Sequence, residues 1–245
     1  MESNKRKDLR LSLCPLFKHR LPAHKKRQQG SRKLLYRVGN QNKIVMIGKT
    51  ISKFMSDHSE GDHGLEALLD YQLSWVLRMA ADSECKPRLK HQCRYILFNL
   101  LGIQDSEAIE ISKVKVWKQW WYIDLVADIY LVENGEKRLH VLMLENKAYT
   151  RMYQHQRDVY PERVKEAYNT YPAYKDYRNY DLHQVLVTCF EKEHSIFQEL
   201  ERFIEKDKCW SIRSVADLPD WSVEEVTESD LFNDFWFNDW KRLTD

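Results

Sequence analysis

The stretch from residue 120 to 147, WWYIDLVADIYLVENGEKRLHVLMLENK, contains two strand-like runs on either side of Asn134-Gly135. Residues 120–132 and 138–145 are rich in aromatic, β-branched and other apolar side chains. Asn-Gly between two such runs is the strongest short-range signal for a type I′ turn, because both turn residues need a positive φ. The stretch therefore predicts a tight antiparallel β-hairpin.

The position of this turn fixes which residues face one another across the hairpin. The numbers of paired residues sum to 269, which sets Asp124 opposite Glu145. Because side chains alternate between the two faces of a strand, we expect Asp124, Glu145 and Lys147 on the same side. A slip of one residue would scatter them to opposite faces. Asp128 shares this face, and could act as a third ligand or replace Asp124.

Three charged side chains on one face indicate a type of chemistry. Two carboxylates a few ångströms apart repel each other unless a cation lies between them. Oxygen ligands with open positions for water and phosphate suit Mg²⁺ or Mn²⁺, so Asp124 and Glu145 are candidate metal ligands. Lys147 points the same way and can orient or help deprotonate an attacking water, and stabilise a pentacovalent phosphate. The pattern predicts phosphodiester hydrolysis, with a solvated salt-bridge ladder as the structural alternative.

Helices and further strands are expected around the hairpin. From Leu65 to Ala80 apolar residues recur at three- and four-residue steps, which is typical of an amphipathic helix. A second helix follows Pro87, with Gly102 at the position of a C-terminal cap. The other expected elements are strands at 109–117 and 185–190, and helices at 151–170 and 195–206. The segment from Trp210 is an acidic and aromatic tail.

The motifs of this region resemble those of a known superfamily. IDLVAD followed by VLMLENKAYT resembles the D…(D/E)xK motif of the PD-(D/E)xK nucleases, which include many restriction and repair endonucleases. More narrowly, LSWVLRMA, YILFNLLGI, YIDLVADIYLV, LMLENK and Gln156…Tyr160 resemble a bacterial family of uncharacterised members. In that family an LAWLL-like helix precedes an RID strand, an IENK strand and a QLxRY helix. The resemblance runs from about residue 65 to about residue 215.

The resemblance implies an α/β fold with a restriction-endonuclease-like αβββαβ core, a mixed central sheet flanked by helices. It implies Asp124 and Glu145 as metal ligands and Lys147 as the catalytic lysine. The sequence departs from the family pattern at Tyr122-Ile123, where Arg-Ile or Pro is usual before the key Asp. This departure bears on the substrate more than on the fold.

The same resemblance assigns roles to three further residues. Gln156 and Tyr160 match the QLxRY positions, one helical turn apart, and would contact the substrate or an attacking water. The intervening residues 157–159, Arg-Asp-Val, follow the LxR part of that motif only loosely. Glu66 on the first helix would match an extra acidic residue that some members place there.

Charge is distributed unevenly along the chain. Residues 1–53 hold 15 Lys and Arg against 2 Asp and Glu, a net charge of +13, whereas the remainder holds 24 against 35, a net charge of −11. We therefore predict a partly flexible basic N-terminal arm at 1–53, followed by the core at 54–215 that the resemblance implies to be nuclease-like, and an acidic aromatic segment at 216–245 packing on the core. A basic arm of this kind can track a polyanion, and a solubilising tail is the alternative.

Partners and compartment follow from composition. No apolar run approaches the roughly 20 residues that span a bilayer, so no membrane association is expected. Five scattered cysteines without a CxxC motif favour a reducing, cytoplasmic location. The expected partner is nucleic acid, DNA in the first instance, and a homodimer is left open. The rival functions are an inactive nuclease-fold DNA-binding or assembly module, a small-nucleotide phosphohydrolase, and an interaction protein that docks through its aromatic tail.

Overall fold

The computed structural model of the chain describes residues 36–38, 41–43, 63–148, 150–171, 179–206, 209–223 and 225–239. The chain divides into two compact units, Met1–Thr50 and Ile51–Asp245. In the first unit, two short strands pair in antiparallel fashion, β1 (Tyr36–Val38) and β2 (Gln41–Lys43). The rest of the predicted basic arm lies outside the described residues.

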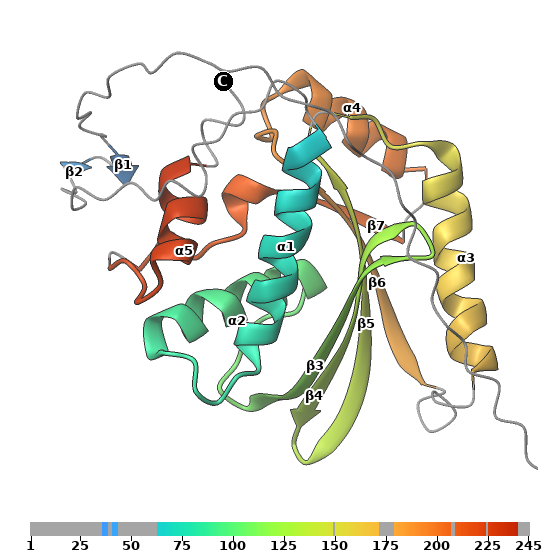
Figure 1. Cartoon of the computed structure of the whole chain (residues 1–245), viewed down its shortest axis with the longest axis horizontal. Helices are drawn as coiled ribbons and strands as arrows, with labels where there is room; N and C mark the ends of the chain where they lie inside the picture. Colours follow the sequence, from blue (N-terminus) through green and yellow to red (C-terminus); the bar gives the residue numbers. More distant parts are fainter. Residues whose placement is uncertain are drawn as a thin grey trace, which may run out of the picture. The chain divides into compact units, whose positions relative to one another are not determined.

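The second unit contains a five-stranded sheet with the order β3-β4-β5-β6-β7 (Figure 1). Its strands are β3 (Ile109–Trp120), β4 (Ile123–Glu133), β5 (Glu136–Lys147), β6 (Tyr180–Thr188) and β7 (Trp210–Ser214). The first three strands are antiparallel, and β6 and β7 continue the sheet in parallel with β5. The expectation of an α/β fold with a mixed sheet is confirmed. Strand β7 was not predicted, because Trp210 was assigned to the acidic tail.

The predicted hairpin joins β4 to β5 in the expected register. Asn134 and Gly135 have φ values of 52° and 81°, as a type I′ turn requires. The ladder runs from Glu133↔Glu136 to Leu125↔Leu144, and every pair obeys the predicted sum of 269. Pairing ends one step before Asp124 and Glu145, so both residues lie at the open end of the ladder.

Helices cover both faces of the sheet, because β4 and β5 are apolar on both sides. On one face, α1 (His63–Ala80) and α2 (Pro87–Leu101) pack against Leu125, Ala127 and Ile129 of β4. On the other face, α3 (Gln154–Thr170) and α4 (Ser195–Ile204) pack against Val126 and Tyr130. This alternation produces the near-continuous apolar runs of the sequence. The predicted helices are confirmed, with shifts of a few residues at their ends.

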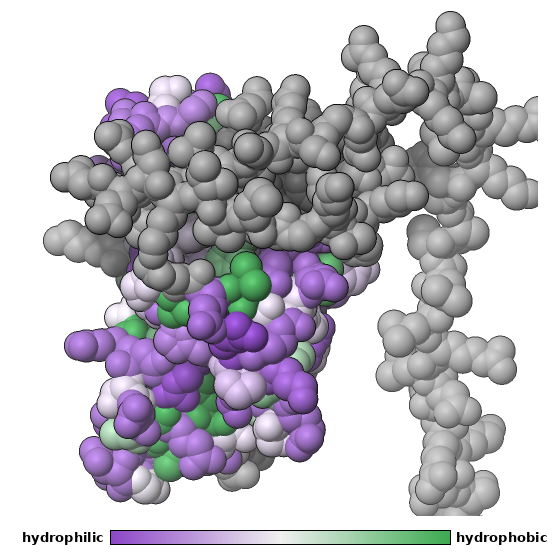
Figure 2. All heavy atoms as spheres, turned by 90° about the vertical axis from the view of Figure 1, so that its left-hand side faces the viewer, coloured by the Kyte–Doolittle hydropathy of each residue, from purple (hydrophilic) through white to green (hydrophobic). Residues whose placement is uncertain are grey.

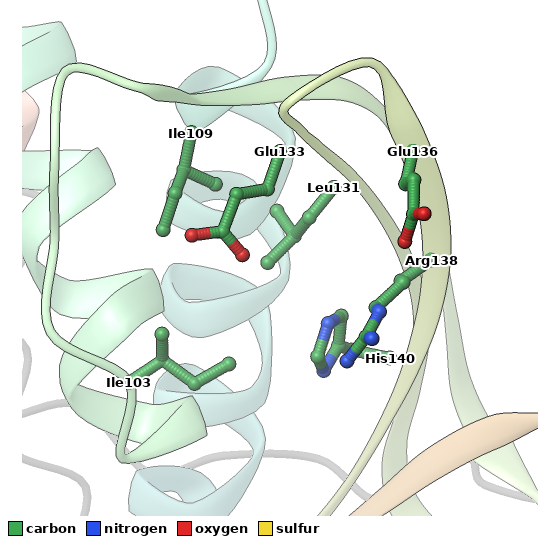
Figure 3. Close-up of a pocket in the computed structure, with 7 residues that line it drawn as sticks. All are labelled: Ile103, Ile109, Leu131, Glu133, Glu136, Arg138 and His140. Carbon is green, nitrogen blue, oxygen red and sulfur yellow. The ribbon is translucent and has the colours of Figure 1, made fainter.

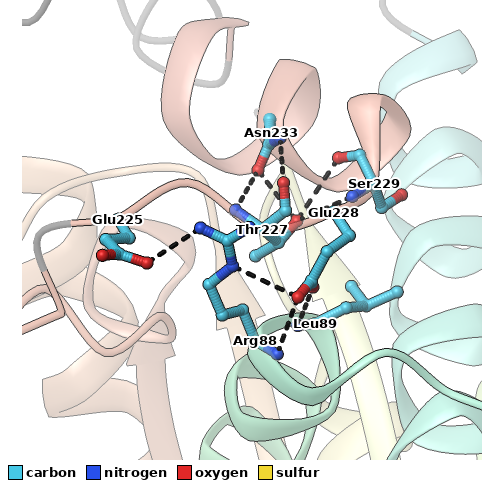
Figure 4. A network of polar contacts seen from close by, with 7 residues as sticks. All are labelled: Arg88, Leu89, Glu225, Thr227, Glu228, Ser229 and Asn233. Carbon is cyan, nitrogen blue, oxygen red and sulfur yellow. Dashed lines mark hydrogen bonds and ion pairs between the residues drawn. The ribbon is translucent and has the colours of Figure 1, made fainter.

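The C-terminal segment is attached to the start of α2. It contains the 3-10 helix η3 (Val215–Asp217), α5 (Asp230–Phe232) and the π-helix η4 (Asn233–Asp239). The Glu228 carboxylate accepts hydrogen bonds from the backbone N–H groups of Arg88 and Leu89 and from the Arg88 side chain (Figure 4). These contacts satisfy N–H groups that a helix start leaves unpaired. Burial opposes ionisation, but the hydrogen bonds outweigh it and lower the pKa of Glu228 to about 2.

Aromatic side chains anchor the same segment in the core. Phe232, Phe235 and Trp236 are buried in the cluster that α1 and α2 form with the sheet.

On the face shown in Figure 2, the coloured surface is mostly hydrophilic, with small hydrophobic areas between the polar ones. None of the described helices is long and apolar enough to cross a membrane.

The turn between β3 and β4 is unusual in its residues. The last pair of this ladder is Trp120↔Ile123, so Trp121 and Tyr122 form a two-residue turn. Their φ values are 52° and 71°, and Gln119 also has a positive φ, of 53°. A left-handed conformation costs a non-glycine residue about 1–2 kcal/mol. The stretch before Asp124 therefore holds three strained residues.

Candidate active site

Glu145 lies at the centre of a buried polar cluster at the end of β5. Its side chain is 1% exposed. Lys147 Nζ donates a hydrogen bond to Glu145 Oε1 over 2.7 Å, and the Gln156 side-chain amide donates to the same oxygen. The other oxygen, Oε2, is buried and accepts no hydrogen bond from the described residues. One carboxylate oxygen is therefore held firmly, and the other remains available to a ligand.

Gln156 is held in place by the start of α3. Its side-chain oxygen accepts a hydrogen bond from the backbone N–H of Tyr153, over 2.9 Å, in a capping-box arrangement. Its amide group is thereby turned toward Glu145. The expected role of Gln156, contact with the substrate or an attacking water, stays a prediction, and in this structure its amide donates to the Glu145 carboxylate.

Asp124 lies just beyond the last backbone pair between β4 and β5. Its Oδ2 accepts a hydrogen bond from the backbone N–H of Asn146 over 2.8 Å. Its Oδ1 accepts one from the Gln119 side-chain amide over 3.2 Å. The carboxylate thus spans from the β3 side to β5, and it lies close enough to Glu145 for its charge to raise the pKa of that residue.

Helix α1 adds two more carboxylates to this end of the sheet. Asp70 accepts hydrogen bonds from the side-chain amides of Asn146 and Gln119, the latter over 3.2 Å. Glu66 accepts from the backbone N–H of Ala148 over 3.3 Å and from the Thr150 hydroxyl over 2.6 Å. Glu66, which the resemblance matched to an extra acidic residue on the first helix, therefore lies next to the end of β5.

The cluster has more negative than positive charge. Burial and the Asp124 charge raise the pKa of Glu145 to about 7, although Lys147 opposes the shift. Burial and the Asp124 charge likewise raise the pKa of Asp70 to about 6. The pKa of Asp124 is also raised by burial, against the effect of the Asn146 N–H and of Lys147. Buried carboxylates of this kind stay ionised more easily when a cation joins them.

The two other predicted residues, Tyr160 and Asp128, differ in their position relative to the cluster. Tyr160 is buried, and its pKa is raised by burial and by the charge of Glu145, so it borders the cluster. Asp128 is 0% exposed, and its carboxylate accepts hydrogen bonds from the phenol groups of Tyr168 and Tyr130. Neither Asp124 nor Glu145 contributes to its raised pKa, which burial causes. The structure does not bring Asp128 into the carboxylate cluster, because the two phenols hold it between β4 and α3.

Three residues of the cluster were missed in the sequence. Asp70 follows Glu66 by one helical turn on a helix whose Leu69 and Leu73 are buried, and a charged pair at that spacing beside an apolar face was a usable signal. Asn146 lies inside the ENK motif itself. Gln119 gave no signal, because its contact with Asp124 depends on its left-handed backbone.

The donor set fits a hard divalent cation that takes few protein ligands. Within the described part of the chain, no group of three or more His, Cys, Asp and Glu side chains is arranged to hold a metal ion. Mg²⁺, however, is commonly held by one or two carboxylates and keeps several water ligands. Glu145 Oε2, which is buried and accepts no hydrogen bond from the described residues, and the adjacent Asp124 carboxylate are the oxygens that could form such a pair.

A separate pocket of about 220 Å³ lies near the turn of the β4–β5 hairpin, at the end opposite to the carboxylate cluster (Figure 3). It is lined by Ile103, Ile109, Leu131, Glu133, Glu136, Arg138 and His140. Its Glu133↔Glu136 pair is eight residues along β4 from Leu125, about 27 Å at 3.4 Å per residue. It contains none of the predicted site residues, so we place the candidate active site at the carboxylate cluster, where perturbed pKa values and convergent polar groups occur together.

Comparison of the chain with protein-family models, curated proteins and solved structures found no match. A fold alone does not define an activity, since one fold carries many functions. The function therefore has to follow from the chemistry of the cluster around Glu145.

Proposed function

We propose that this chain is a metal-dependent nuclease of the PD-(D/E)xK type, which hydrolyses phosphodiester bonds of nucleic acid, DNA in the first instance. The observation that carries the proposal is the meeting of Asp124, Glu145 and Lys147 at one end of the β4–β5 hairpin. The element order α2, β3, β4, β5, α3, β6 agrees with the αβββαβ order of that core.

Each side chain of the cluster has a distinct role in the proposed reaction. Asp124 and Glu145 would hold Mg²⁺ or Mn²⁺, which when bound lowers the pKa of a water ligand and offsets charge on a phosphate. Lys147 keeps its proton, because the negative charge of Glu145 outweighs the effect of burial and raises its pKa. Its ammonium group can therefore stabilise negative charge on a phosphate oxygen or position a water. Gln156 fixes the orientation of the Glu145 carboxylate through its amide.

A purely structural ion pair accounts less well for the cluster. Burying carboxylates that keep raised pKa values costs stability, and well-packed apolar residues would avoid that cost. Glu66, Asp70, Asp124 and Glu145 interact electrostatically at one end of the sheet, and among the described residues Lys147 is the cation that balances Glu145 directly. Such concentrations of perturbed groups are typical of functional sites. The inactive DNA-binding or assembly module remains the alternative function, and the experiments below separate the two.

Mg²⁺ is expected to stabilise the protein in a pH-dependent way. The pKa of Glu145 is raised from 4.5 to about 7, so its protonated form favours folding below pH 4.5, and this contribution is lost as the pH rises through 7. At pH 8, a Mg²⁺ concentration a hundred times the Kd should therefore raise Tm by about 5 °C or more. The same Mg²⁺ concentration at pH 5 should raise Tm by much less. Thermal unfolding with Mg²⁺ or EDTA measures this.

The matched variants for that measurement are Glu145→Gln and Asp128→Asn. Both remove one buried carboxylate, but only the first removes a proposed metal ligand. The Mg²⁺ effect should disappear in Glu145→Gln and persist in Asp128→Asn. An equal rise in both variants would place the cation elsewhere.

Cleavage tests the proposed activity itself. We expect the full chain to cut supercoiled plasmid, linear duplex DNA or single-stranded DNA with Mg²⁺ or Mn²⁺, and to be inactive in EDTA. Ca²⁺ should support binding but little turnover. A parallel reaction with RNA decides between the two nucleic acids. If neither is cut under any of these conditions, the nuclease proposal fails and the binding module takes its place.

A further inference from the structure

The sheet contains two hairpins whose two-residue turns both have positive φ at each turn residue but differ in residue type. Asn134 and Gly135 have φ values of 52° and 81°, and Trp121 and Tyr122 have 52° and 71°. Asn and Gly adopt positive φ easily, whereas aromatic residues pay a steric cost there. Asn-Gly would serve the second turn as well as the first. Turn geometry therefore does not explain the Trp-Tyr pair.

Core packing does not explain this pair either. Tyr122 is 78% exposed and Trp121 is 40% exposed, while the preceding Trp120 packs against the core on the α3 side. Exposed aromatic residues in a strained turn indicate a function outside the fold.

The position of this turn connects it to the candidate active site. Asp124 follows Tyr122 after one residue, at the start of β4. Gln119, just before the turn, donates its side-chain amide to both Asp124 and Asp70. The turn and the carboxylates therefore lie at the same end of the sheet, and Gln119 beside the turn donates hydrogen bonds to two of the carboxylates.

The aromatic surface is held in place from within. The Trp121 ring stacks on the Trp120 ring, with centroids 4.8 Å apart and planes 4° from parallel. Tyr171, at the end of α3, meets Trp121 edge-on at 6.3 Å. Because Trp120 is packed on the core, the Trp121 ring has a fixed orientation. A preorganised ring loses little conformational freedom when a planar ligand stacks on it.

One cation lies beside Trp121, and a second lies over the ring of Tyr71 in α1. The Arg163 guanidinium donates to the Trp121 carbonyl over 3.3 Å. On the side of α1, Lys118 Nζ lies 2.9 Å from the centre of the Tyr71 ring, which is 63% exposed. Rings for stacking combined with cations for phosphates are the two features by which proteins bind single-stranded nucleic acid.

We propose that Trp121 and Tyr122 form a stacking platform for an unpaired base, so that the preferred ligand is single-stranded DNA or an unpaired region of a duplex. This inference rests on the proposed function, whose substrate class it narrows. A stacking ring needs the open face of a base, and bases inside a duplex present only their edges in the grooves. By stacking on a base, the ring of Tyr122 would hold an unpaired strand next to Asp124.

The test compares two variants of one side chain in the full-length protein. Tyr122→Gly removes the ring and supplies a residue that suits a positive φ, so Tm should not fall. Tyr122→Phe keeps the ring. Binding is measured by fluorescence anisotropy with a mixed-sequence single-stranded oligodeoxynucleotide and with its duplex, in Ca²⁺. Tyr122→Gly should weaken single-strand binding by about 5- to 150-fold and leave duplex binding unchanged, whereas Tyr122→Phe should bind like the wild type.

The outcomes separate this inference from the nuclease proposal. Wild-type affinity for the single strand in Tyr122→Gly overturns the platform, even if cleavage with Mg²⁺ is observed. Absence of single-strand binding by the wild type overturns it too. Tyr122-dependent binding without any cleavage supports the platform and overturns the nuclease assignment.

Discussion

Replacing Glu145 with Gln is expected to reduce metal-dependent cleavage at least about a thousandfold while the protein stays folded. The substitution keeps the shape of the side chain and an oxygen that can accept from Lys147. It removes the negative charge with which we propose that Glu145 binds a divalent cation, at a carboxylate whose Oε2 has no hydrogen-bond partner among the described residues. Single-turnover cleavage rates and circular dichroism of the two proteins measure the effect.

Lys147→Ala should produce a loss of similar size for a different reason. Without the ammonium group, negative charge at the phosphate is unbalanced and Glu145 takes up a proton more readily, because its pKa is already raised to about 7. Asp128→Asn is the control, since Asp128 is equally buried but bonded to Tyr168 and Tyr130. Cleavage that survives in Glu145→Gln and is lost in Asp128→Asn would mean that Asp128, and not Glu145, is the catalytic carboxylate.

Removing residues 1–35 is expected to weaken DNA binding at low salt by at least about a hundredfold. This segment lies outside the described residues and carries 11 Lys and Arg, whereas the remainder of the chain after residue 53 has a net charge of −11. Each lost phosphate contact should reduce the magnitude of the slope of log K against log salt by about 0.9. The slope is measured from binding isotherms at several salt concentrations.

A full-length variant with the same basic residues changed to Gln is the matched control, because it retains the length of the arm. Both variants should keep wild-type cleavage rates at saturating DNA, since Asp124, Glu145 and Lys147 are unchanged. A salt slope equal to that of the wild type would mean that the arm does not contact the backbone.

The hairpin could be predicted from sequence because its signals are local. Asn134-Gly135 permits one turn type, and the apolar runs on either side leave one register that buries both strands. The same arithmetic placed Asp124 and Glu145 together at the end of the ladder. The helices and most strands could be predicted from the change between a period of two and a period of 3.6 along the chain, whereas the αβββαβ core was implied by the resemblance alone.

The remaining parts of the site depend on contacts between distant segments. Asp70 reaches Asn146 across 76 residues of sequence, and no local pattern encodes that contact. The left-handed Gln119, Trp121 and Tyr122 could not be predicted, because propensity disfavours positive φ at such residues and tertiary context overrides it. Strand β7 was missed for a related reason: it has five residues, and the acidic tail after it obscured its pattern.

The rate of plasmid cleavage as a function of Mg²⁺ concentration tests most directly whether Asp124 and Glu145 hold a catalytic cation. The wild-type protein should be inactive in EDTA and gain activity along a saturable Mg²⁺ curve, while Glu145→Gln should stay inactive throughout. Full cleavage in EDTA, or an unchanged Mg²⁺ curve for Glu145→Gln, would contradict the assignment of this site.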